Sequence, residues 1–353
     1  MNLNMYGNGI TVRNVNEALP TGLQYLREHG IPAESRGMKT LRVPGPMMTV
    51  YLKPTERVLF NPVRDANPFF HLFEAMWILS GSRSIWLPKV FLNNIDRFSD
   101  DGASFHGAYG YRLRQHFGFD QIIRAVDTLR RTPDSRQVVL SIWDPKVDLG
   151  AATKDVPCND MIMVDLVDNK LNMMVCNRSN DVIWGAYGAN AVQFSVLQEY
   201  LAIALGAQVG IYTQLSYNYH VYLDNPFWQS FEGAPLGTPD ATLYDYLIKD
   251  PNYGGLRPLA VNAMDLEVLY IDCVKLNVAA EQGVDLRDVE LSSSFGKMVL
   301  TPAIHAYGAY KEKDYLSAIG IANSQIGAPD WSLAMAEWLH RRMVNAERKV
   351  VQA

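Results

Sequence analysis

The chain has few cysteines, and their number is odd. Among 353 residues there are three, Cys158, Cys176 and Cys273. Their spacing matches neither the disulfide framework of a small secreted protein nor a metal-binding motif. We therefore expect a reducing compartment, and we expect no metal site.

The sequence also lacks an excess of positive charge and any long hydrophobic run. Lys and Arg number 32 against 37 Asp and Glu, which gives a net charge of -5. Binding to a nucleic-acid backbone requires clustered Lys and Arg, whereas a small phosphorylated ligand requires only a few arginines. No run reaches about 18 apolar residues, and the polar segment 1–13 has no apolar core of a signal peptide. These absences predict a cytoplasmic protein with neither nucleic acid nor membrane as partner.

Two common nucleotide-binding motifs are missing as well. Residues 107–112 are rich in glycine, but they follow neither the GxGxxG nor the GxxxxGK pattern, so a dinucleotide site or a P-loop has no support. No internal repeat is visible. The composition, 48% hydrophobic and 20% charged, is typical of a soluble globular protein and argues against disorder.

Helical and strand-like patterns alternate along the first two thirds of the chain. Helices are predicted over 21–29, 69–79, 120–131 and 191–205, and strands within 34–60, 136–143, 161–167, 171–176 and 209–222. Residues 227–257 are loop-rich, and three helical patterns follow over about 262–281, 299–324 and 330–349. We predict an α+β core over 1–225, and we predict that residues 226–353 form a loop-rich segment and a helical extension packed on that core.

One short stretch combines a cysteine with an arginine and an aspartate. Pro157-Cys158 stands before a predicted hairpin, and Arg178, Ser179 and Asp181 follow its second strand. An isolated Pro-Cys pair usually holds a small buried hydrophobe. Here the hairpin would bring a nucleophile and an anion-binding group together, so both interpretations stay open until other motifs are considered.

Two further polar residues lie in otherwise apolar surroundings. Glu74 stands in the middle of the apolar helix 69–79. An interior carboxylate is costly unless it is hydrogen-bonded or handles protons with a raised pKa, and the stretch alone does not decide between these roles. His220 and Tyr222 are two residues apart, so they share one face of a strand. A lone buried histidine is more often structural than functional.

Five motifs in a fixed order resemble the thymidylate synthase superfamily, which includes pyrimidine nucleotide hydroxymethylases of phages and some bacteria. The resemblance covers roughly residues 34–225. The motifs are Ser35-Arg36-Gly37, the run from Glu74 to Gly81, Asp134-Ser135-Arg136, Pro157-Cys158 followed by residues 178–181, and His220-Val221-Tyr222. The resemblance implies an α+β fold whose large mixed sheet is flanked by helices and packs back-to-back in a symmetric homodimer.

The chemistry of this superfamily suits these residue types. Addition of a thiolate to carbon 6 of a pyrimidine makes carbon 5 nucleophilic toward a one-carbon unit carried by 5,10-methylenetetrahydrofolate. The resemblance assigns that thiolate to Cys158. Nearby arginines are expected to favour the thiolate by lowering the thiol pKa from about 8.5.

The resemblance also implies a role for each matching residue. The predicted catalytic residues are Cys158, Glu74, Tyr109 and Asn190, and the predicted substrate-binding residues are Arg36, Arg136, Arg178, Ser179, Asp181, His220 and Tyr222. The phosphate would be held by Arg36, Arg178 and Ser179, and Arg136 would reach across from a partner subunit. His220 and Tyr222 would bind the sugar 3′-hydroxyl, and Asp181 the pyrimidine. Glu74 would order water and relay protons, with Tyr109 in the same proton network.

Several departures from the synthase pattern bear on the reaction. Asn159 stands where a synthase has histidine, Gln137 replaces a second arginine, and the helical C-terminus does not resemble the synthase tail that closes over folate. Segment 185–190 is one residue longer than the pattern. Asn190 reads the base if the extra residue is absorbed before it, whereas an ungapped alignment places Ala189 there.

These departures favour hydroxymethylation by water over methylation by hydride. The aspartate expected for a deoxycytidylate enzyme is absent, which favours deoxyuridylate as substrate and leaves deoxycytidylate as the alternative. The sequence therefore predicts a folate-dependent deoxyuridylate hydroxymethylase. A thymidylate synthase that releases dihydrofolate is the second hypothesis, and a catalytically silent nucleotide- or RNA-binding relative is a distant third.

Overall fold

A six-stranded mixed sheet forms one layer of the molecule. The computed structural model describes residues 7–231, 243–249 and 255–351. Across the sheet the strands are β1 (Asn8–Val12), β4 (Met47–Tyr51), β9 (Gln208–Ser216), β7 (Lys170–Asn177), β6 (Asn159–Val167) and β5 (Val139–Ser141). The pairs β1–β4 and β7–β9 are parallel, and the other neighbours are antiparallel.

A smaller four-stranded sheet adjoins it, in the order β2 (Ile31–Ser35), β3 (Met38–Arg42), β10 (Tyr219–Tyr222) and β8 (Asn180–Asp181). The strand predicted over 209–222 is thus two strands, because the chain leaves the large sheet after Ser216 and enters the small one at Tyr219. The predicted strand 136–143 is shorter than expected and pairs only over Val139–Ser141.

Two central helices carry much of the core, and both have strong local signals. Helix α2 (Pro68–Ser80) begins where the Asn67 side chain accepts a hydrogen bond from the Phe70 amide, and it ends at Gly81, whose φ of 76° favours glycine. Helix α7 (Asn190–Leu205) ends in the same way at Gly206, with φ of 67°. Almost every side chain of α2 is buried because the helix lies between two layers.

The remaining elements complete the layers. They are α1 (Val15–His29), α3 (Trp86–Phe91), α4 (Tyr109–Tyr111), α5 (Gln121–Arg131), α6 (Pro145–Asp148), α8 (Pro226–Phe231), α9 (Leu243–Lys249), α10 (Ala263–Glu281), α11 (Thr301–Lys311), α12 (Tyr315–Gln325) and α13 (Pro329–Val351), with short 3₁₀ turns at 95–98 and 286–288 and π-helical turns at 112–116, 182–189 and 296–300. The helix predicted over 299–324 is broken near Lys313, which has a positive φ of 67°. Within the described ranges no helix is both long and apolar enough to cross a membrane.

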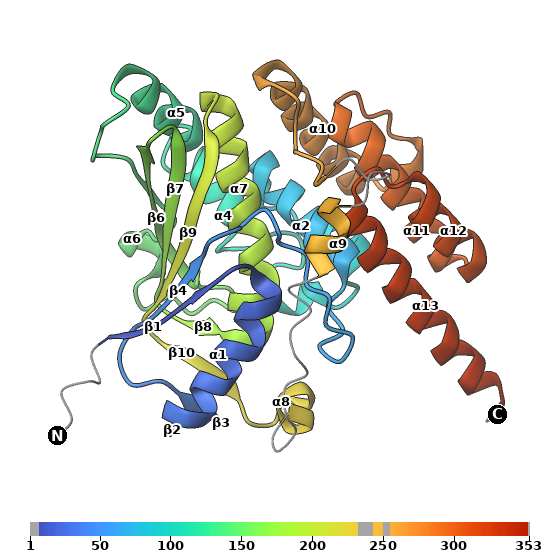
Figure 1. Cartoon of the computed structure of the whole chain (residues 1–353), viewed down its shortest axis with the longest axis horizontal. Coiled ribbons are helices and arrows are strands. Elements are labelled where there is room, and N and C mark those ends of the chain that lie inside the picture. Colours follow the sequence, from blue (N-terminus) through green and yellow to red (C-terminus); the bar gives the residue numbers. More distant parts are fainter. Residues whose placement is uncertain (1–6, 232–242, 250–254, 352–353) are drawn as a thin grey trace.

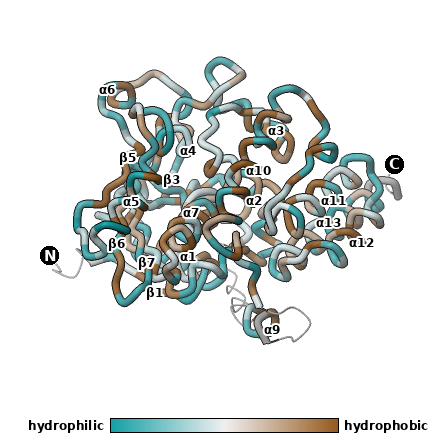
Figure 2. Tube along the Cα trace, turned by 90° about the horizontal axis from the view of Figure 1, so that it is seen from above, coloured by the Kyte–Doolittle hydropathy of each residue, from teal (hydrophilic) through white to brown (hydrophobic). Residues whose placement is uncertain are grey.

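The C-terminal helices share the core of the sheet domain. Helix α7 packs on β7 and β9, α2 packs on α7, and α10 and α13 pack on α2 (Figure 1). Seen from above, α2 and α7 lie between the sheet and α11–α13 (Figure 2). Cys273 of α10 contacts the sulfur of Met76 in α2 at 3.7 Å, and Asn277 donates to Ser80 at 2.9 Å. The mixed α+β architecture with C-terminal helices agrees with the prediction.

The opposite face of the large sheet remains accessible in the single chain. Alternate residues of β4, β5, β6 and β9 point to this outer face and leave apolar side chains exposed: Met48 39%, Val139 51%, Met161 39% and Ile211 42%. The opposite residues, such as Val175 and Tyr212, are buried under α7. Exposed apolar side chains gathered on one face of a sheet are typical of a protein interface.

A substitution in α10 tests whether the C-terminal helices share one cooperative core. Leu269 is fully buried, whereas Ile271 on the same helix is 51% exposed. We expect Leu269→Ala to lower the free energy of unfolding by about 2–5 kcal/mol, because it removes buried contacts and leaves a cavity. Ile271→Ala should change it by less than about 0.5 kcal/mol. Urea unfolding followed by circular dichroism should show one transition; two transitions, with only one of them shifted, would contradict a shared core.

Candidate active site

The pairing of β6 with β7 brings Cys158 and Arg178 together. Asn159 at the start of β6 pairs with Asn177 at the end of β7, and the Arg178 amide donates to the Cys158 carbonyl at 3.0 Å. A guanidinium nitrogen of Arg178 lies 3.8 Å from the Cys158 Sγ. Arg178 also donates to the carbonyls of Pro157 at 2.7 Å and Val156 at 2.9 Å. The cation is thus held at the loop that carries the thiol.

The predicted direction of the Cys158 pKa shift is wrong. Burial raises the pKa of the Cys158 thiol, and the positive charges of Arg178 and Arg36 oppose this effect without overcoming it. Asp155 and Asp160 add to the increase. The expectation of a lowered pKa considered the arginines alone and omitted the desolvation of the sulfur.

Glu74 lies at the wall of a pocket beside this thiol. Burial raises the pKa of its carboxyl to about 7, opposed by a hydrogen bond with Gln193. One carboxyl oxygen, Oε2, is buried and has no hydrogen-bond partner among the described residues. A carboxyl that is half protonated near neutral pH can either accept or donate a proton, so the proton-handling interpretation fits this environment better than a purely structural one.

The pocket, of about 290 Å³, combines aromatic walls with carboxyl groups. Its lining residues include Glu74, Trp77, Phe98, Phe105, Tyr109, Asp155, Trp184, Gly185, Ala189, Asn190 and Gln193. Asp155 accepts a hydrogen bond from the Gly107 amide at 2.8 Å, and burial raises the pKa of Asp155 to about 6. A Cβ at Gly107 would lie 2.6 Å from the Asp155 carbonyl oxygen, so only glycine permits this approach of the two loops.

Three asparagines meet near the thiol. Asn190 donates to Asn180 at 3.2 Å and to Asn159 at 3.5 Å, and all three side chains are buried. Asn190 follows the π-helical turn 182–189, in which the chain accommodates more residues per turn than an α-helix does. Tyr109 stacks on Phe194, with ring centroids 6.0 Å apart, and burial raises the pKa of its hydroxyl well above the usual range.

Beside the thiol, the small sheet contributes a second group of polar side chains. His220 pairs in register with Asp181 across β10 and β8, and its ring lies 5.2 Å from that of Tyr222. Asp181 Oδ2 and His220 Nε2 are buried without a hydrogen-bond partner in the described part of the chain. Both atoms are therefore available to pair with a polar ligand.

Arg36 and Ser179, which were also predicted to bind the phosphate, lie near this group of side chains. Arg36 occupies the exposed β2–β3 turn with a positive φ of 54°. Burial raises the pKa of both Tyr222 and Cys158, and the charge of Arg36 opposes this rise at both residues. Ser179 directly follows Arg178 and is half-buried.

Arg136 lies elsewhere in the single chain. It is exposed at the outer face of the large sheet, where it lines a hollow of about 410 Å³ with Met163, Met174 and Ile211. The side chains that surround Cys158 do not line this hollow. The structure thus brings ten of the eleven predicted site residues to one region, and Arg136 is the exception.

Sequence reasoning missed the groups that support the site. Asp155 has no distinctive motif, although it stands three residues before Cys158. A buried ion pair links Arg112 to Asp148 at 2.8 Å, and Asp148 also contacts His106 at 2.7 Å. This network joins the loop before Gly107 to the loop before Asp155. Its members are far apart in sequence, so no local pattern could have revealed it.

The family of this chain is established by comparison with known proteins. The thymidylate synthase family model matches residues 21–228. The chain therefore belongs to the thymidylate synthase family and is an enzyme that transfers one-carbon groups. Membership implies a nucleotide substrate and a folate.

Among curated relatives, a deoxyuridylate hydroxymethyltransferase of Pseudomonas phage M6 is 39% identical over 98% of this chain and 97% of its own length. The enzyme of the same name from Bacillus phage SP01 is 39% identical over 51% of this chain and 50% of its own length. A thymidylate synthase of Clostridium beijerinckii is 28% identical over 53% of this chain. The solved structure of thymidylate synthase from T4 phage has a TM-score of 0.51 at 21% identity, covering 61% of this chain and 79% of its own, which supports the fold.

The raised pKa of Glu74 predicts a specific pH dependence of stability. The folded chain binds the Glu74 proton more tightly than the unfolded chain, because the pKa rises from 4.5 to about 7 on folding. The free energy of unfolding should therefore fall as the pH rises through this window. Relative to the wild type, Glu74→Gln should gain up to about 3 kcal/mol between pH 4.5 and 7.

The measurement is urea unfolding at several pH values, with the exposed Glu281→Gln as control. A difference between Glu74→Gln and wild type that does not change with pH would show that the carboxyl is not desolvated in the folded chain.

Proposed function

We propose that this enzyme transfers a one-carbon unit from 5,10-methylenetetrahydrofolate to carbon 5 of deoxyuridylate and that water completes the reaction, giving 5-hydroxymethyl-deoxyuridylate. The observation that carries the proposal is the position of the Cys158 thiol, 3.8 Å from a guanidinium nitrogen of Arg178 and beside the pocket that holds Glu74 and Asn190. Near full-length similarity to a deoxyuridylate hydroxymethyltransferase supports it.

Arg36, Arg178 and Ser179 bind the phosphate in this proposal, and His220 with Tyr222 binds the sugar. His220 Nε2 and Asp181 Oδ2, both buried without a partner among the described residues, gain one from the nucleotide. Binding of the nucleotide places carbon 6 at the Cys158 sulfur, which adds there as the thiolate. Carbon 5 then forms a bond to the one-carbon unit and loses its proton, and the bond between that unit and the folate nitrogen breaks, so that tetrahydrofolate leaves and an exocyclic methylene remains on the ring. Water adds to this methylene, and the Cys158 sulfur leaves carbon 6.

The pocket beside Cys158 fits a folate. Its aromatic walls, including Trp77 and Trp184, suit a flat heterocycle, and the carboxyl groups of Glu74 and Asp155 suit the N–H donors of a pterin. When bound there, 5,10-methylenetetrahydrofolate supplies the one-carbon unit. Glu74 can order water and exchange protons at neutral pH, because its pKa is raised to about 7.

Asn190 is the proposed base-reading residue. Its amide offers both a donor and an acceptor, which matches the N3–H and O4 of uracil. The π-helical turn 182–189 holds more residues per turn than an α-helix does, and the buried amide of Asn190 follows it, which supports Asn190 rather than Ala189 in this role. Asn159, fully buried next to it, occupies the position where a synthase has histidine, and we assign the preference for water to this change.

We further propose that two copies pack through the outer face of the large sheet. That face exposes Met48, Val139, Met161 and Ile211 and also carries Arg136. Because Arg136 lies apart from Cys158 in its own chain, it would complete the phosphate site of the partner subunit. The permanent charge and planar fork of arginine suit this contact.

The fate of the one-carbon unit can be read from the product. Deoxyuridylate and 5,10-methylenetetrahydrofolate in ¹⁸O-labelled water should give a hydroxymethyl nucleotide that carries one ¹⁸O, and no dihydrofolate absorbance should appear. Mass spectrometry of the nucleotide decides the outcome, and Cys158→Ala serves as the inactive control. A methyl product with dihydrofolate formed in equal amount would identify the enzyme as a synthase instead.

Mixing two impaired variants tests whether Arg136 acts across the interface. Arg136→Ala should bind nucleotide weakly, and Cys158→Ala should be inactive. Each heterodimer of the two variants keeps one site with both groups intact, so random exchange should restore activity to about a quarter of the wild type. Activity of the mixture is measured after subunit exchange. If it stays at the sum of the separate variants, Arg136 does not act in trans.

A further inference from the structure

A buried arginine connects the C-terminal side of the core to the pocket. Arg64 lies in the loop before α2, and its Nε donates to the Ile183 carbonyl at 2.9 Å. Its guanidinium lies 4.2 Å from the ring of Trp184, which is 60% exposed and lines the pocket. A Cβ added at Gly188, within the π-helical turn, would lie only 3.1 Å from an Arg64 nitrogen, so the guanidinium packs closely against this glycine. Arg64 thus supports the π-helical turn that directly precedes Asn190.

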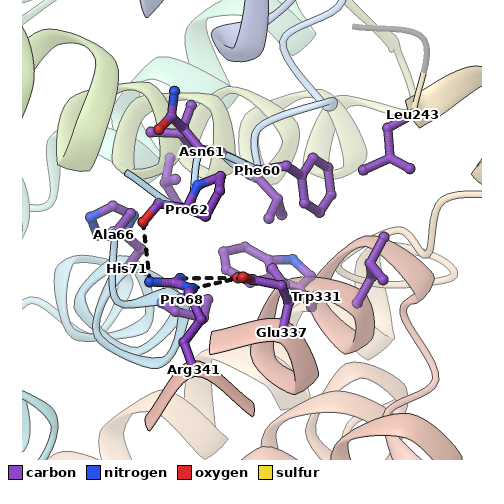
Figure 3. Close-up of a pocket in the computed structure, with 15 residues that line it drawn as sticks. Phe60, Asn61, Pro62, Ala66, Pro68, His71, Leu243, Trp331, Glu337 and Arg341 are labelled. Atoms are coloured by element: carbon purple, nitrogen blue, oxygen red, sulfur yellow. Dashed lines mark hydrogen bonds and ion pairs between the residues drawn. The ribbon is translucent and has the colours of Figure 1, made fainter. Parts of the chain in front are cut away.

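The next residue, Asp65, is held by the last helix of the chain. Asp65 has a positive φ of 52°, in the left-handed region that favours glycine. Its carboxylate forms ion pairs with both Arg341 and Arg342 of α13, the latter at 2.8 Å. Arg341 also donates to the Pro62 carbonyl at 3.3 Å and to Glu337 (Figure 3). The loop is therefore attached to α13 on both sides of Arg64.

Helix α13 is itself anchored to the core independently of these arginines. Trp338 is buried and packs edge-on against Phe69 of α2, with ring centroids 5.8 Å apart, and Leu339 and Met335 are fully buried. The ion pairs are partly exposed, with Asp65 at 44% and each arginine at 23%. Pairs of this kind contribute little to stability. They are too weak to hold the fold, but they suffice to select one conformation of a short loop.

We propose that Arg341 and Arg342 are positioning residues, which hold the Asp65 loop so that Arg64 fixes Trp184 and the π-helical turn at the pocket. The lowered pKa of Arg64, about 10, reflects its burial and agrees with a cation placed for contact rather than for solvation. This inference rests on the proposed function in one respect: it takes the pocket as the folate site. The physical connection from α13 to Trp184 does not depend on that assignment.

The test combines kinetics with fluorescence in the full-length enzyme. In Arg341→Ala/Arg342→Ala the KM for 5,10-methylenetetrahydrofolate should rise about fivefold with a smaller change in kcat, because a displaced wall weakens binding more than chemistry. Acrylamide quenching of Trp184, obtained as the difference from the same protein carrying Trp184→Phe, should increase about twofold as Arg64 leaves the ring. Arg348→Ala, on the exposed side of α13, is the matched control and should change neither quantity.

A double-mutant cycle decides whether the effect passes through Arg64. Arg64→Ala should reproduce both changes, and adding Arg341→Ala/Arg342→Ala to it should raise the KM no further, because residues that act in series are not additive. Asp65→Asn removes the same ion pairs from the loop side, and asparagine tolerates the positive φ at this position. This variant replaces Arg341→Ala/Arg342→Ala if the latter does not fold. Unchanged quenching and an unchanged KM would overturn the proposal, as would additive effects. If the wild type shows no turnover but quenching still responds, the proposed function fails and the connection stands.

Discussion

The antiparallel register between β6 and β7 determines the site. Because Asn159 pairs with Asn177, the residues just outside the pair, Cys158 and Arg178, are held at one end of the hairpin. The parallel pairing of β7 with β9 then directs the chain through Ser216 to β10, where His220 pairs with Asp181. A shift of one residue in this register would turn Cys158 away from Arg178, since successive strand residues face opposite sides.

Burial and charge act against each other throughout the pocket. Burial raises the pKa of Cys158, Glu74 and Asp155, and the arginines only partly offset this effect at the thiol. Burial disfavours the charged forms of these side chains. Such a site suits a ligand whose own polar and charged groups pair with them. At Glu74 a hydrogen bond with Gln193 opposes burial instead, and the pKa of the carboxyl is raised to about 7.

The sequence predicted the elements better than their arrangement. The hairpin around residues 168–169, the buried helix with Glu74 and the helix ending at Gly206 have strong local signals, and the structure contains all three. The division of 209–222 between two sheets, the break at Lys313 and the Arg112–Asp148 network depend on contacts between distant segments, so local patterns could not show them. The thiol pKa was mispredicted for the same reason: the arginines are visible in sequence, whereas desolvation is a property of the folded chain.

The central claim is that Cys158 adds to carbon 6 of the pyrimidine while the one-carbon unit is attached at carbon 5. Fluorine at carbon 5 cannot leave as a proton does, so 5-fluoro-deoxyuridylate with 5,10-methylenetetrahydrofolate should stop the reaction with the nucleotide bound to sulfur. Intact-protein and peptide mass spectrometry should find the combined mass of nucleotide and folate on the peptide containing Cys158, and none in Cys158→Ser. A normal rate of turnover without any adduct, or an adduct on Cys176 or Cys273, would contradict the account.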